Sequence, residues 1–175
     1  MEQFERKMQA ELDTLVDVSA EVRRGAALEI LVDTLREAFV LRPDEVAILL
    51  VSPDGAVLSF AYPVELAAGG SNAFPVALPS LAGRVAVEGV SVCSNRLPEE
   101  PHLGFYERVA VRGMQPVPIQ KLLAVPLRES GAGILGVIEI SRRGETRAEA
   151  GPDFGPEEQQ RLARLVGMAA AVLPH

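Results

Sequence analysis

The sequence predicts a mixed fold of the α/β class, in which an antiparallel sheet is covered by helices. Two apolar segments, residues 121–128 and 134–142, flank a short polar connector that contains glycine, which is the pattern of a β-hairpin. Amphipathic helical patterns stand at both ends of the chain. Because two strands alone are not stable in water, the hairpin requires a larger sheet with helices against it. A chain of 175 residues is long enough for one such domain.

The composition indicates a folded protein and argues against several classes of function. Hydrophobic residues make up 48% of the chain and charged residues 23%, which is ordinary for a folded domain. The net charge of -7 argues against a nucleic-acid partner, which requires clustered lysine and arginine. The sequence shows no N-terminal signal pattern and no apolar run of the roughly 18 to 20 residues that a membrane span needs. We therefore predict a cytoplasmic protein without a membrane partner.

The first 40 residues are predicted to be helical. Residues 1–24 are assigned as an N-terminal amphipathic helix that pairs two copies of the chain in a homodimer. The alternative is that this helix covers one face of its own domain. We expect a break near residues 23–25, and residues 25–175 form the domain proper. The apolar side chains of the first segment recur at steps of three and four and are Phe4, Met8, Leu12, Leu15, Val18 and Val22.

The next segment predicts a second hairpin. Residues 45–52 are almost continuously apolar, as expected of a strand buried on both faces. The turn sequence Pro-Asp-Gly at residues 53–55 leads into a second strand over residues 56–62. Residues 65–79 contain glycines and two prolines, and we interpret them as a loop with at most one short turn of helix.

The remaining elements are short until the end of the chain. Ser80 is placed to cap a helix over residues 81–88, and a strand over residues 90–93 follows. Residues 95–117 are interpreted as a loop with a short helix near residues 104–111. After the hairpin described first, Pro and two glutamates at residues 156–158 open a last amphipathic helix, where proline is tolerated and the helix dipole favours carboxylates.

The order of these elements resembles that of a GAF domain, and so do the local sequences of four segments. The resemblance extends over residues 25–173. The resemblance depends on four segments: the short helix with its following strand, the two strands of the last hairpin, and the entry into the final helix. In this sequence they are residues 80–86 with 89–92, residues 122–127, residues 135–140, and Phe154 with Glu157 and Glu158.

The resemblance implies a central antiparallel sheet of five or six strands, with the terminal helices on one face. On the other face it implies a ligand pocket, closed by the short helices and loops of residues 63–120. Members of the family bind cyclic nucleotides, tetrapyrroles, haem, amino acids and other small molecules, often as dimers through the terminal helices, and many are attached to other domains. Because the last helix runs almost to the final residue, we expect a stand-alone protein with a single GAF domain.

We predict that the ligand-binding residues make a mostly apolar concavity with a few polar groups, as in other small-ligand sites. The N-terminus of the helix at residues 81–88 would suit an anionic group. A closed core that binds nothing is the alternative, and the ligand and any cofactor are unknown. The predicted lining residues are Phe60, Tyr62, Phe74, Leu81, Arg84, Val85, Cys93, Asn95, Tyr106, Leu122 and Ala124.

Two nucleotide-binding patterns are argued against. Residues 131–136 match GxGxxG, but that motif requires a helix after the glycines, and a strand pattern follows here, so we interpret the glycines as a turn. Cyclic-nucleotide-binding GAF domains carry a set of residues of which only the phenylalanine, Phe154, is kept. Their lysine to aspartate ion pair is expected to persist as Arg142 with Glu158. The other aligned positions hold Ser141 and Gln159.

The sequence offers no catalytic or metal-binding set. The free methionine sulfoxide reductases of the family need more than one cysteine, whereas this chain has only Cys93, which we interpret as a small buried apolar residue. His102 lies in a proline-rich loop without a convincing set of metal ligands. We therefore predict a sensor that signals ligand binding through its terminal helices to a protein partner. The alternatives are a ligand-free scaffold for protein interaction or dimerisation and, third, a reductase-like enzyme.

Overall fold

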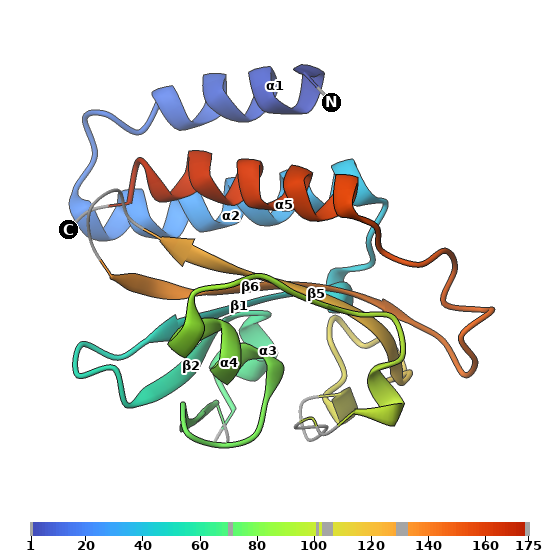
Figure 1. Ribbon diagram of the computed structural model, residues 1–175. Helices are drawn as coiled ribbons and strands as arrows, with labels where there is room; N and C mark the ends of the chain where they lie inside the picture. The colour runs from blue at the N-terminus through green and yellow to red at the C-terminus, as the bar shows by residue number, and fades with distance from the viewer. Residues whose placement is uncertain (1, 70–71, 101, 103–106, 129–132, 174–175) are drawn as a thin grey trace.

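The structure is a computed structural model that describes residues 2–69, 72–100, 102, 107–128 and 133–173. Three long helices are stacked on one face of the sheet, and short helices and loops cover the other face (Figure 1). The long helices are α1 (Glu2–Asp13), α2 (Ala20–Phe39) and α5 (Pro156–Ala170). The short ones are α3 (Val64–Ala67), α4 (Leu81–Glu88) and the 3-10 turns η1 (Pro43–Glu45) and η2 (Leu97–Glu99).

The sheet has six strands in the order β3-β2-β1-β6-β5-β4, and each neighbouring pair is antiparallel. The mixed fold and the antiparallel sheet predicted from the sequence are confirmed. The strands are β1 (Val46–Val51), β2 (Val57–Tyr62), β3 (Ala73–Pro75), β4 (Val92–Ser94), β5 (Ile119–Arg128) and β6 (Ile134–Arg143).

The predicted hairpin of residues 121–128 and 134–142 is present as β5 and β6, at the centre of the pairing. A strand follows Gly133, so no helix is available to make the GxGxxG pattern a phosphate site. Gly131 and Ala132 of that pattern lie outside the described residues, as do the first three residues of the short helix predicted near residues 104–111.

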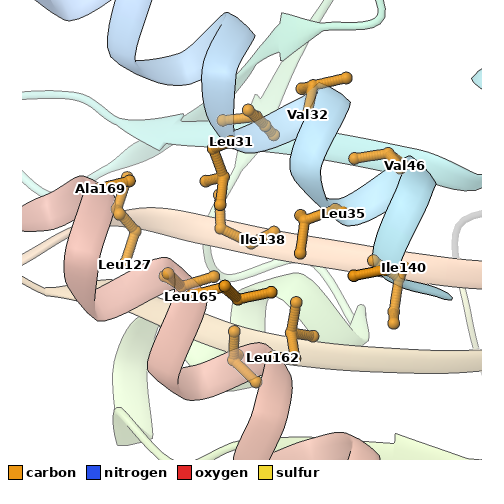
Figure 2. Close-up of a cluster of buried hydrophobic side chains, with 14 of the residues drawn as sticks. Leu31, Val32, Leu35, Val46, Leu127, Ile138, Ile140, Leu162, Leu165 and Ala169 are labelled. Carbon is orange, nitrogen blue, oxygen red and sulfur yellow. The ribbon is translucent and has the colours of Figure 1, made fainter. Parts of the chain in front are cut away.

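The main core lies between the sheet and the pair α2 and α5. Figure 2 shows Leu31 and Leu35 of α2 and Leu162 and Leu165 of α5 facing Ile138 of β6, and all of these side chains are fully buried. Along β5 and β6, alternate residues enter this core, because successive side chains of a strand point to opposite faces of the sheet. The residues between them face the short helices and loops.

The N-terminal helical region contains a sharp reversal between α1 and α2. The sequence predicted a break later in the chain. The helix α1 ends at Asp13, and the Oγ atom of Ser19 accepts a hydrogen bond from the amide of Val22 at the start of α2. The guanidinium of Arg23 donates to the carbonyl oxygen of Leu15 at 3.0 Å and also binds the carbonyls of Val16 and Val18. The break predicted near residues 23–25 is therefore wrong, because Arg23 closes the reversal from within α2.

The apolar seam of α1 is used inside the chain. Met8 and Leu12 are fully buried in the core that α2 and α5 share, and α1 lies on these two helices as an outer layer (Figure 1). This is the arrangement that we gave as the alternative to pairing between two copies. The dimerisation role of residues 1–24 stays a prediction.

We expect Leu12→Ala to lower the free energy of unfolding by about 2–5 kcal/mol, because it removes a fully buried side chain and leaves a cavity between α1 and its neighbours. The matched control is Val16→Ala in the following turn, where the side chain is 69% exposed and the expected change is small. Urea unfolding of both variants measures the difference. Equal and small effects would show that α1 does not belong to the cooperative core.

Candidate functional site

A small cavity lies between the sheet and its cover of short helices and loops. Its volume is about 20 Å³, which is room for one water molecule. From the sheet, Ala47, Leu122, Glu139 and Ser141 line it, and from the cover Leu66 of α3 and Val111 line it, among others. The cavity lies on the face of the sheet opposite the terminal helices. This is the face where the sequence predicted a pocket.

Glu139 is the unusual residue of this cavity. It lies in the middle of β6 with only 3% of its surface exposed, and it pairs with Ala47 of β1 on one side and Ala124 of β5 on the other. Of these two small side chains, Ala47 lines the cavity beside the carboxylate. Among the residues that the structure describes, none donates a hydrogen bond to this carboxylate or forms an ion pair with it. Burial raises the pKa of Glu139 to about 7 from its ordinary value of 4.5.

The other charged side chains that line the cavity are paired with each other. The guanidinium of Arg143 lies 3.5 Å from the Asp44 carboxylate and donates to the Asp44 carbonyl oxygen at 2.9 Å. It also donates to the carbonyl of Val117 at 2.8 Å. The Glu45 carboxylate accepts the backbone amides of Arg42 and Arg143, both at 2.8 Å. This network fixes the end of β6, and among the described lining residues it leaves Glu139 as the acid without a partner.

Six of the predicted pocket residues lie on the cover side of the sheet. Phe60, Phe74, Val85 and Ala124 share one buried cluster, in which the rings of Phe60 and Phe74 are 6.2 Å apart. Leu81 and Leu122 belong to the adjoining cluster. Of these six, Leu122 lines the cavity itself. Their contact with a ligand remains a prediction.

Tyr62 lies on the opposite face of the sheet, against the helix layer. Regular alternation would place it beside Phe60, but a bulge shifts the register, so that Phe60 pairs with Leu49 and Tyr62 pairs with Ile48. The Tyr62 hydroxyl donates to the carbonyl of Pro43 at 3.3 Å. Its predicted convergence with the other pocket residues is therefore wrong.

Asn95 and Cys93 also lie on the helix side. Cys93 pairs with Leu123, whose side chain enters the helix-side core. The Asn95 side chain is bound twice to the backbone of Phe154, since its amide donates to the carbonyl at 3.0 Å and its oxygen accepts the N–H at 2.8 Å. Asn95 thus joins the edge of the sheet to the start of α5. The prediction that Cys93 and Asn95 face the pocket is therefore wrong.

The expected burial of Cys93 is wrong as well, because the residue is exposed. It lies in β4, a short strand at the edge of the sheet, where less of the chain covers it. Its thiol is near the Phe154 carbonyl, at 3.8 Å. Partial burial of the thiol, together with the negative charges of Glu158 and Asp153, raises the pKa of Cys93, which disfavours the reactive thiolate.

Arg84 does not line the cavity. The side chain of Arg84 is exposed on α4, and Tyr106 lies outside the described residues. The predicted pair of Arg142 and Glu158 is confirmed at 2.6 Å, and the Arg142 guanidinium lies 4.2 Å from the centre of the Phe154 ring. This group is on the helix side of the sheet, where it fixes the start of α5.

The residues predicted for the pocket did not include Glu139, although the sequence around it indicates an unusual position. In the segment Val-Ile-Glu-Ile it is a lone acid within an otherwise apolar strand of a predicted central hairpin. A charged side chain is rarely placed there unless it is paired or functional. Its two alanine neighbours could not be identified without the register of β1 and β5.

The described part of the chain was also compared with the requirements of a metal site and of a membrane-spanning helix. No group of three or more His, Cys, Asp and Glu side chains within it is arranged to hold a metal ion. Among its helices, none has the length and apolar character required to cross a membrane.

Comparison with known proteins agrees with this architecture. A family model described as GAF domain matches residues 24–173. The GAF domain of an Acinetobacter phosphoenolpyruvate-protein phosphotransferase matches with a TM-score of 0.68 at 15% identity, over 98% of this chain and 90% of that one. The corresponding domain from Coxiella burnetii matches with a TM-score of 0.67 at 18% identity, over the same shares.

An enzyme structure is similar as well. The free methionine-R-sulfoxide reductase from Neisseria meningitidis, in complex with its substrate, matches with a TM-score of 0.60 at 15% identity, over 97% of this chain and 87% of that one. At such identities the likeness concerns the fold alone. A search of curated proteins finds no significant match.

We expect Glu139→Gln to change how stability depends on pH. The folded protein holds a proton on Glu139 that the unfolded chain releases between pH 4.5 and about 7, so the free energy of unfolding falls as pH rises through that window. The variant lacks this loss. Relative to the native protein it should gain about 3 kcal/mol between pH 4.5 and pH 8.

Urea unfolding at a series of pH values measures this change. Glu157→Gln, on the exposed start of α5, is the matched control and should follow the native curve. If the curves of the native protein and Glu139→Gln stay parallel, the Glu139 carboxyl is not buried as described.

Proposed function

Because the chain belongs to the GAF domain family, we propose that it is a cytoplasmic regulatory module that binds a small molecule between the sheet and its cover. In this proposal the ligand's presence is transmitted to the terminal helices and on to a signalling partner. The observation that carries the proposal is the buried Glu139 carboxylate, which faces the cavity without a partner among the described residues. Buried polar groups are almost always hydrogen-bonded, so an exception needs an explanation, and a missing ligand supplies one.

Binding of an organic molecule requires the cover to move. The cavity holds a single water molecule as it stands. Two parts of the cover meet over it, α3 with Leu66 and the segment with Val111, and the Glu65 carboxylate joins them by accepting the amide of Arg112 at 2.7 Å. This link is exposed, and a hydrogen bond of that kind adds little stability. Separation of these two parts would enlarge the cavity, and contacts with the ligand must offset the exposure of the buried Leu66 and Val111 side chains.

The strand β6 provides a physical connection from the cavity to the helices. Glu139 points toward the cavity, while its neighbours Ile138 and Ile140 point into the core that α2 and α5 form (Figure 2). A displacement of β6 at Glu139 therefore displaces side chains that contact the helices. A ligand shifts the packing of the helices only if it binds one arrangement more tightly than another.

The proposal assigns no enzymatic activity to the chain. Cys93 is on the opposite face of the sheet from the cavity, and its pKa is raised rather than lowered. A thiol that attacks a substrate in this cavity would have to be a thiolate on the cavity face. The similarity to the sulfoxide reductase therefore does not extend to a reductase activity in the proposal.

A thermal-shift screen of a metabolite library tests the binding function. We expect at least one compound to raise the melting temperature of the native protein, because a ligand that binds the folded state stabilises it. Ala47→Val puts a larger side chain into the cavity lining beside Glu139 and should abolish that shift. Ala163→Val on the exposed side of α5 is the control and should retain it. A library without any stabilising compound, or an Ala47→Val variant that still responds fully, would contradict the proposal.

A second candidate function is protein interaction through a homodimer. Two large apolar side chains beside the reversal between α1 and α2 favour it, since Val16 is 69% exposed and Val22 is 56% exposed. Exposed apolar side chains of this kind are typical of contact surfaces when they lie together.

For this candidate, light scattering should give twice the chain mass of 18.7 kDa for the native protein. The double variant with Val16→Asp and Val22→Asp should give the single-chain mass, because charges would be buried without partners in the contact. Val87→Asp, at an exposed position of α4 on the other side of the sheet, should leave the dimer intact. A native protein that stays monomeric at high concentration would exclude this candidate.

A further inference from the structure

Glu139 and its surroundings define the chemistry that a ligand must bring to the cavity. We propose that the cavity selects a small aliphatic amine, whose ammonium group pairs with the Glu139 carboxylate. This inference rests on the proposed binding function and adds the ligand class. It follows from three properties of the described lining. Glu139 is an acid without a partner, the other charged side chains are paired with each other, and the walls are apolar.

The first property is the accepting character of the carboxylate. An ionised glutamate has no donor, so its two oxygens require donors from elsewhere. An ammonium group supplies three donors and an opposite charge, which makes charge-assisted hydrogen bonds. Ala47, directly opposite Glu139 on β1, lines the cavity with a small side chain, so the cavity borders the carboxylate there. The Ser141 hydroxyl, one of the other polar groups of the lining, can accept a further hydrogen bond.

The second property is the charge balance. Among the described residues that line the cavity, the other ionisable ones are Asp44 of η1 and Arg143 of β6, and they form an ion pair at 3.5 Å. The lining residues from β1, β5, α3 and the segment that contains Val111 carry no ionisable side chain. With Glu139 ionised, the lining has a net charge of one negative unit. An anionic ligand would meet repulsion there, whereas a cation would be attracted.

The anionic site suggested for the start of α4 does not alter this balance. The residues Ser80, Leu81 and Arg84 border a separate hollow at the surface, and the Oγ atom of Ser80 is occupied as the cap of the helix. Neither Ser80 nor Arg84 lines the cavity that contains Glu139. The two sites therefore have different chemistry and different locations.

The third property is the apolar character of the rest of the lining. Leu66, Val111, Ile119 and Leu122 surround the polar groups from the cover and from β5. Such walls favour the hydrocarbon part of a ligand and disfavour further polar groups, which would lose their hydration without compensation. A short aliphatic chain that ends in an ammonium group satisfies both parts of the cavity.

The raised pKa of Glu139 gives the pairing a specific dependence on pH. An alkylammonium ion keeps its charge between pH 6 and pH 8, while Glu139, with a pKa of about 7 in the free protein, changes its charge in that range. Binding requires the ionised carboxylate, so below the pKa the ligand must first displace a proton. The affinity should therefore be about tenfold weaker at pH 6 than at pH 8.

The test uses the full chain and n-butylammonium chloride as the probe, with calorimetry and thermal shift as measurements. Three comparison compounds have matched size or charge: 1-butanol is neutral, butyrate is anionic, and potassium chloride supplies a cation without donors. We expect n-butylammonium to bind and to raise the melting temperature, and the three others not to. Glu139→Gln should weaken binding roughly tenfold to a hundredfold, because it removes the charge of the acceptor. Glu157→Gln should bind as the native protein does.

The native protein provides an arm that does not depend on any variant folding, since the loss of affinity from pH 8 to pH 6 is measured on it alone. Equal binding of 1-butanol, butyrate or potassium chloride, full binding by a folded Glu139→Gln variant, or an affinity independent of pH would each overturn the amine proposal. If library compounds stabilise the protein but no amine does, the amine proposal fails while the binding function stands. If no compound stabilises it, both fail.

Discussion

The alternation of side chains along β6 is the constraint on which the rest of the structure depends. This strand lies inside the sheet with both of its faces covered, so each residue must satisfy one of two different environments. Ile138 and Ile140 complete the core beneath α2 and α5, while Glu139 between them must point to the other side. A shift of register by one residue would bury Glu139 among leucines and expose the isoleucines to the cavity. The helix-side core therefore fixes the position of the carboxylate.

Sequence patterns predicted the elements with a clear period or with clear boundaries. The last helix has a helical period, whereas the central hairpin and the buried strand of residues 45–52 are apolar segments of strand length bounded by turn residues. The reversal between α1 and α2 was misplaced because it depends on Arg23 binding three carbonyls at a distance, and no local pattern encodes such contacts. The apolar seam of α1 was correctly identified. A seam cannot show by itself whether its partner is the same chain or another copy.

Part of the predicted pocket lining lies together on one face of the sheet for a related reason. The cluster around Phe60 and Phe74 follows from assigning strands to one sheet, and this was possible from the sequence. Tyr62 was misplaced by a bulge of one residue, and Asn95 by the direction of an edge strand. Both depend on pairing between distant segments. Glu139 was overlooked because its isolation depends on two alanines from other strands, and those neighbours are known only once the register is known.

In the proposed function, the polar contacts on the helix side are a route by which a small site influences the packing of the helices. Lys121 of β5, buried among apolar neighbours, pairs with Asp153 at 2.8 Å, and Arg142 of β6 pairs with Glu158 at 2.6 Å. Asn95 adds two hydrogen bonds from β4 to the backbone of Phe154. Three successive strands are thereby tied to the segment that leads into α5. A ligand that moves β6 relative to β5 would strain these ties in a concerted way, since side chains with fixed partners cannot adjust independently. Contacts from three neighbouring strands therefore meet at the start of α5.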